Sequence, residues 1–116
     1  MIIVAGHLDL VSRGDRDAVI AAAAELQPAT LDEPGCHAYC FAPDPCIDVR
    51  IQVYELWEDQ ASLAAHFEHP NYTAMRNALR QGTRAATQIE KFRCDLSEPV
   101  YDETHTPRAD FFTEAT

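Results

Sequence analysis

Alternating apolar and polar positions predict β-strands in four stretches of the chain. A turn at Pro34-Gly35 precedes the second stretch, and a hairpin loop at Pro43-Asp44-Pro45 separates the second from the third. The first stretch has apolar side chains at both odd and even positions, as in Ile2-Ile3-Val4-Ala5, so we expect both of its faces to be covered. The four predicted strands are residues 2–11, 36–42, 48–57 and 87–95.

Helical spacing of apolar residues predicts three helices between these strands. The first runs from about Arg16 to Gln27 and ends at Pro28, because proline disrupts a helix interior. Two short helices, residues 59–67 and 70–80, follow the third strand. The order β-α-β-β-α-(α)-β is that of a ferredoxin-like α+β fold, an antiparallel sheet with helices on one face. We expect a homodimer, in which a second copy covers the other face.

Length and composition indicate one domain and a tail. A chain of 116 residues is large enough for a single modest core, which we place in residues 1–95. Residues 96–116 carry one base and five acids, namely Glu98, Asp102, Glu103, Asp110 and Glu114. This acidic tail either packs on the partner subunit through its aromatic residues or is solvated.

Charge and hydropathy exclude two classes of partner. A net charge of -10 argues against nucleic acid, because phosphate binding needs clustered Lys and Arg. No apolar run approaches the roughly 20 residues that span a bilayer, so we expect no membrane partner.

The opening residues lack the basic start of a signal peptide, which predicts a cytoplasmic location. The four cysteines are then expected to be reduced, and their spacing predicts no metal site.

The segment from the third strand to the last helix combines the side chains of greatest chemical interest, namely Glu55, Trp57, His66, Tyr72 and Arg76. Each also has a structural interpretation. His66 can hydrogen-bond backbone where the two short helices meet, and Glu55 can pair with Arg76 or cap a helix. Trp57 can be a core aromatic residue.

The same segment resembles the antibiotic biosynthesis monooxygenase family. The resemblance rests on a strand that ends Glu55-Leu56-Trp57, an acidic helix start at Glu58-Asp59, and Leu63 followed three residues later by His66. Pro70 before Tyr72 completes the pattern. The similarity extends from Met1 to about Asp95, and it implies a dimeric α+β barrel.

The resemblance implies a monooxygenase that uses O2 on a phenol- or quinol-like aromatic molecule without a cofactor. A non-catalytic dimeric protein that binds a similar small ligand is the alternative, since the same fold would serve it. In the haem-degrading branch an Asn, a Trp and a His serve the haem, whereas the corresponding positions here hold His7, His66 and Arg76. Arginine cannot act as an axial ligand, so haem degradation is disfavoured.

Oxygenation without a cofactor needs a phenolate that can itself give an electron to O2. The protein must therefore remove a phenolic proton and stabilise the anion. His66 or His7 would act as the base and Arg76 as the stabilising cation. The residues expected to bind the aromatic substrate are Trp57, Tyr72, Glu55 and Phe67.

Overall fold

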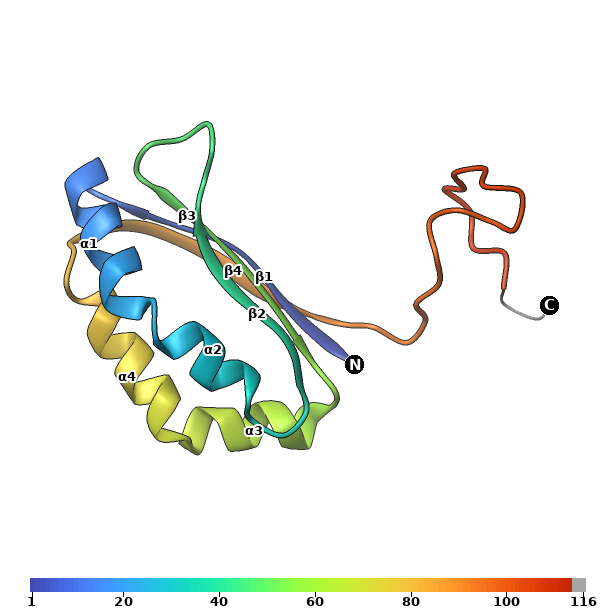
Figure 1. Cartoon of the computed structure of the whole chain (residues 1–116), viewed down its shortest axis with the longest axis horizontal. Coiled ribbons are helices and arrows are strands. Elements are labelled where there is room, and N and C mark those ends of the chain that lie inside the picture. The colour runs from blue at the N-terminus through green and yellow to red at the C-terminus, as the bar shows by residue number, and fades with distance from the viewer. Residues whose placement is uncertain (114–116) are drawn as a thin grey trace.

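The computed structural model describes residues 1–113 and forms one antiparallel sheet with all its helices on one side (Figure 1). The strands lie in the order β2-β3-β1-β4. This is the predicted ferredoxin-like α+β fold, so the fold class is confirmed. The elements are β1 (Ile2–Leu10), α1 (Arg13–Ala23), α2 (Leu26–Leu31), β2 (Cys36–Pro43), β3 (Arg50–Trp57), α3 (Gln60–Glu68), α4 (Pro70–Leu79) and β4 (Arg84–Arg93).

The helical region between β1 and β2 differs from the prediction. Two helices, α1 and α2, replace the single expected helix, and Pro28 lies within α2 instead of ending a helix. Pro28 is the third residue of α2, where a backbone N–H would have no partner within the helix. A proline therefore costs no helical hydrogen bond at this position. The start also moves, to Arg13, because Ser12 Oγ accepts a hydrogen bond from the backbone N–H of Asp15 at 3.1 Å.

Side-chain caps fix the starts of the two short helices. Asp59 Oδ1 accepts hydrogen bonds from the backbone N–H and the hydroxyl of Ser62, each at 2.8 Å. His69 Nδ1 accepts one from the backbone N–H of Asn71 at 3.0 Å, and Pro70 is the first residue of α4. These contacts confirm the predicted break between the two helices.

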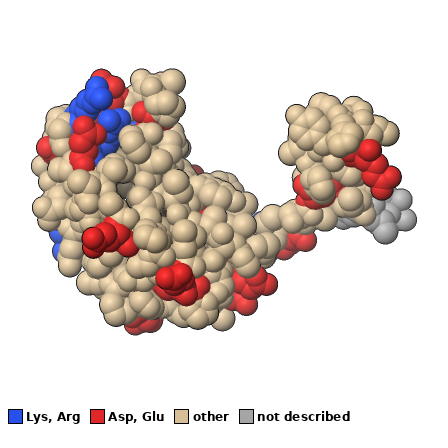
Figure 2. Space-filling view, viewed as in Figure 1, with Lys and Arg blue, Asp and Glu red and all other residues tan. Residues whose placement is uncertain are grey.

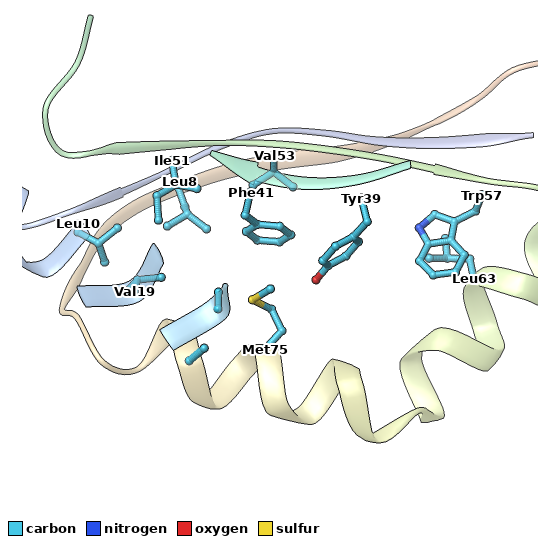
Figure 3. Packing of buried hydrophobic residues seen from close by; sticks show 12 residues of the cluster. Leu8, Leu10, Val19, Tyr39, Phe41, Ile51, Val53, Trp57, Leu63 and Met75 are labelled. Atoms are coloured by element: carbon cyan, nitrogen blue, oxygen red, sulfur yellow. The ribbon is translucent and has the colours of Figure 1, made fainter. Parts of the chain in front are cut away.

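The helices cover only part of the sheet. They pack mainly on β2 and β3, whereas β4 pairs with β1 at the sheet edge and only its Ile89 is partly shielded from solvent. The core lies between the covered part of the sheet and the helices, and Figure 3 shows Phe41, Tyr39 and Trp57 extending from the strands toward the helices. These buried residues include Leu8, Leu10, Val19, Tyr39, Phe41, Ile51, Val53, Trp57, Leu63 and Met75.

The opposite face of the sheet has no helix on it in the described part of the chain. The strand register places Ile3 beside Leu56 and Phe92, and Ala5 beside Tyr54. Phe92 is 50% exposed and Tyr54 is 44% exposed. This face, which we call the open face, thus carries exposed apolar side chains next to polar ones such as Gln88 and Glu90, and exposed apolar patches often mark an interface.

After β4 the chain forms an arm, residues 96–113, that extends away from the body (Figure 1). Asp102 organises it by accepting hydrogen bonds from Thr104 and Thr106. The arm exposes Val100 and Phe111, and Figure 2 shows its acidic side chains. The last three residues of the predicted tail lie outside the described residues. No helix within residues 1–113 is long and apolar enough to cross a membrane.

Candidate functional site

A cavity of about 430 Å³ lies between the sheet and the helices α3 and α4. An adjoining hollow of about 620 Å³ shares part of its lining and follows the uncovered β4. A wall that is mostly apolar with a few polar groups is typical of a small-molecule site. The polar groups include Glu55, His66, Arg76 and Arg84; the apolar and aromatic lining is Val4, Leu8, Tyr39, Phe41, Phe67, Tyr72, Met75, Leu79 and Ile89.

His66, on α3, is the most buried titratable group of this wall. It is 2% exposed, and its ring packs against Trp57 and Tyr72, with centroid distances of 4.6 and 5.6 Å. Its Nδ1 lies 2.9 Å from Oε1 of Glu33. A carboxylate only accepts hydrogen bonds, so in the neutral imidazole Nδ1 carries the proton and Nε2 has the lone pair. The pair therefore leaves His66 ready to accept a proton at Nε2.

Glu33, which the sequence analysis did not select, lies in the connection between α2 and β2. It is 7% exposed, and its Oε2 accepts a hydrogen bond from Nδ2 of Asn71 at 3.1 Å. The neighbouring Gly35 has φ of +79°, and a Cβ there would lie 2.0 Å from Oγ of Ser62 on α3. Glycine thus allows this connection to approach α3 closely enough for Glu33 to reach His66.

Glu55 does not form the predicted ion pair with Arg76 and does not cap a helix. Its Oε1 instead accepts a hydrogen bond from Nε1 of Trp57 at 2.9 Å, because the two side chains are neighbours on one face of β3. Glu55 is 7% exposed, and burial raises the pKa of its carboxyl group above the usual value. Burial, followed by the nearby Glu55 and Glu33, also raises the pKa of Tyr39, so its hydroxyl stays protonated.

This environment predicts a pH-dependent stability difference between the wild type and Glu55→Gln. The folded-state pKa of Glu55 lies above its unfolded value, so the folded chain binds more protons between the two values, and stability falls as the pH rises through them. Glutamine keeps an oxygen acceptor for Trp57 but does not titrate. Chemical unfolding from about pH 4 to about pH 8 should therefore show the variant gaining stability relative to the wild type. A difference that is constant with pH would contradict the prediction.

The structure brings five of the seven predicted site residues onto the cavity wall: Glu55, His66, Phe67, Tyr72 and Arg76. Trp57 is fully buried behind the wall, where it contacts His66 and Glu55. His7 lies elsewhere, in a shallow hollow on the open face with Gln88 and Phe92. The alternation of β1 explains the separation, because the even-numbered Val4 and Leu8 point to the cavity and odd-numbered residues point away. His7 therefore cannot act together with His66 within one subunit.

Comparison with known proteins identifies the family. The sequence model of the antibiotic biosynthesis monooxygenase family matches residues 1–78. The chain belongs to this family. A solved structure of a family member from Deinococcus radiodurans gives a TM-score of 0.74 at 19% identity, covering 88% of this chain and 100% of that one. A conserved protein of unknown function from Bacteroides thetaiotaomicron gives 0.66 at 25% identity, covering 78% and 95%.

Two relatives illustrate how far sequence similarity extends. An uncharacterized protein of Synechocystis is 31% identical over 71 residues, which cover 61% of this chain and 48% of that protein. The Escherichia coli K12 protein named "Probable quinol monooxygenase YgiN" is 33% identical over 73 residues, covering 56% of this chain and 70% of its own length. The chain thus matches about half of the first relative and more than two thirds of the second.

Proposed function

We propose that this member of the antibiotic biosynthesis monooxygenase family oxidises a phenol- or quinol-like aromatic molecule with O2 and uses no cofactor. The observation that carries the proposal is His66, which lies on the wall of an aromatic-lined cavity and is paired through Nδ1 with the buried carboxylate of Glu33. The name of the Escherichia coli relative supports a quinol as the substrate type.

The proposed reaction begins with proton transfer from a substrate hydroxyl to His66 Nε2. Glu33, hydrogen-bonded to Nδ1, stabilises the imidazolium that forms. The guanidinium of Arg76 stabilises the phenolate in surroundings that are otherwise apolar. The protonated hydroxyl of Tyr39 is a further donor on the same wall.

The phenolate then supplies the electrons for oxygen reduction. It passes one electron to O2, the two radicals combine into a hydroperoxide at a ring carbon, and loss of water leaves a new carbonyl group. A naphthohydroquinone plus O2 thus becomes a hydroxynaphthoquinone plus water, and each product receives one of the two atoms of O2. Both electron pairs come from the substrate, so the balance needs no external reductant.

Oxygen consumption by the purified protein tests this function. With reduced menadione and several polycyclic phenols, and a metal chelator present, we expect uptake above the uncatalysed rate and an oxygenated product in place of hydrogen peroxide. Ligand binding without any uptake would contradict the proposal. That result would favour the alternative, a non-catalytic protein that binds the same class of ligand.

We also propose that the protein is a homodimer in which two open faces pack together and complete an α+β barrel. A monomer would leave Phe92 and Tyr54 about half exposed on an apolar face. In the same proposal the arm of each copy packs on the other copy. This arrangement would bury Val100 and Phe111, which the described chain leaves in solvent.

The dimer proposal predicts that Phe92→Glu shifts the protein from dimer to monomer. A carboxylate on the open face would have to be desolvated in the dimer, which costs several kcal/mol. Light scattering coupled to size-exclusion chromatography measures the mass directly. Leu31→Glu is the control, because Leu31 is 43% exposed but lies on α2, on the helical side. A dimer that survives in Phe92→Glu would contradict the prediction.

A further inference from the structure

Two arginines line the mouth of the cavity, and neither pairs with an acidic side chain of the described residues. Arg76 projects from α4 with its guanidinium carbon 5.9 Å from the centre of the Tyr72 ring. Arg84 is the first residue of β4 and lines the same cavity. Both side chains are solvent-exposed where they reach the cavity. Two cations from different elements, neither with an acidic partner among residues 1–113, therefore line the same cavity.

The charge of the whole chain makes this arrangement unusual. Acidic residues outnumber basic ones by 19 to 9. Five of the basic residues form ion pairs within residues 1–113, namely Arg13, Arg16, Arg50, Arg93 and Arg108. Of the four others, Arg76 and Arg84 line the cavity and Lys91 lines the adjoining hollow. Within residues 1–113, three of the four basic residues without an ion pair thus line one mostly apolar site, where Glu90 is the acid beside Lys91.

The cavity itself supplies little negative charge to balance these arginines. Its lining carboxyl group, Glu55, is buried, hydrogen-bonded to Trp57 and not ion-paired with either arginine. Burial also favours its neutral form, because it raises the pKa of Glu55. A ligand that fills the cavity would therefore meet an aromatic interior at one end and a positive mouth at the other.

We propose that the substrate is an aromatic carboxylic acid with a hydroxyl group next to its carboxylate, so that Arg84 binds the carboxylate at the cavity mouth and Arg76 contacts both the carboxylate and the neighbouring phenolate oxygen. The proposal rests on the function proposed above for the role of the hydroxyl group and deepens it by naming the substrate class. A planar carboxylate suits guanidinium groups, which donate paired, charge-assisted hydrogen bonds to it. The aromatic ring would pack against Phe67 and Tyr72, with the hydroxyl group toward His66.

Binding of two matched probes tests the proposal without any turnover. 1-Hydroxy-2-naphthoate and 1-hydroxy-2-naphthamide have nearly the same shape and differ by one negative charge. In calorimetric titrations of the wild type at neutral pH and low salt, we expect the acid to bind at least about tenfold more tightly than the amide. Added salt should reduce the preference, because the arginines are exposed.

Arginine variants identify the side chains that bind the carboxylate. Arg84→Gln should lose most of the preference, and the double variant with Arg76→Gln should lose all of it. Arg80→Gln is the matched control, because Arg80 is also exposed, follows α4 directly, and lies outside the cavity lining. Circular dichroism would verify that each variant folds.

Three outcomes would overturn the proposal: equal binding of acid and amide, binding of neither, or an undiminished preference in the double variant. Failure of the oxygenase proposal gives a different result. A wild type that consumes no oxygen with any quinol, yet prefers the acid tenfold, would support the carboxylate site and contradict only the reaction. Oxygen uptake without any preference would contradict only the carboxylate site.

Discussion

Replacing His66 with glutamine is expected to lower oxygen uptake with a quinol by about 10²–10⁴-fold, the usual contribution of a general base. A glutamine amide can still donate a hydrogen bond to Glu33, so the local structure should survive. It cannot accept a proton at neutral pH, so the substrate would stay protonated. The measurement is the initial rate at saturating quinol for the wild type and the variant, with unfolding curves to show that both are folded.

His69→Gln provides the matched control for this experiment. Its Nδ1 lies 3.9 Å from Oε2 of Glu33, so it contacts the same carboxylate as His66 does, but it caps α4 outside the cavity. We expect it to retain a rate within about twofold of the wild type. Uptake that persists at the wild-type rate in His66→Gln would show that His66 is not the base.

Glu33→Ala is expected to reduce the free energy of unfolding by about 3 kcal/mol, because it leaves buried polar groups without partners. The Nδ1–H of His66 would have no acceptor, and the amide of Asn71 would lose the contact at 3.1 Å. Urea unfolding measures the loss. Glu68→Ala on exposed α3 surface should change stability by less than about 0.5 kcal/mol. A loss below about 1 kcal/mol in Glu33→Ala would mean that the pair contributes little to folding.

The parts of the fold that were predicted correctly depend on local patterns. The alternation in β3 and the breaks at Asp59 and Pro70 are visible within a few residues, so the strand and both short helices follow from sequence. The single predicted helix at residues 16–27 failed because a proline is harmless in the first turn, and the start of α2 has no distinctive sequence signal.

The candidate site was also predicted only where local sequence patterns were sufficient. The predicted residues on β3, α3 and α4 meet because these elements are consecutive in the chain. Glu33 was missed because it reaches His66 from 33 residues earlier, and an acid before Pro34-Gly35 reads as an ordinary turn residue. Arg84 was missed because β4 was expected to begin at residue 87. His7 was grouped with His66 because alternation separates the two faces of β1 but does not say which of them the helices cover.

The position of β4 at the sheet edge also bears on aggregation. An edge strand has free backbone N–H and C=O groups on its outer side, and such groups can recruit strands from other molecules. Here β4 carries charges at Arg84, Glu90, Lys91 and Arg93, and the opposite edge strand β2 has a register irregularity near its start and Pro43 at its end. Charges, bulges and prolines are the features by which native sheets prevent edge-to-edge pairing. The chain can thus expose an apolar sheet face for association while its sheet edges are protected against fibril growth.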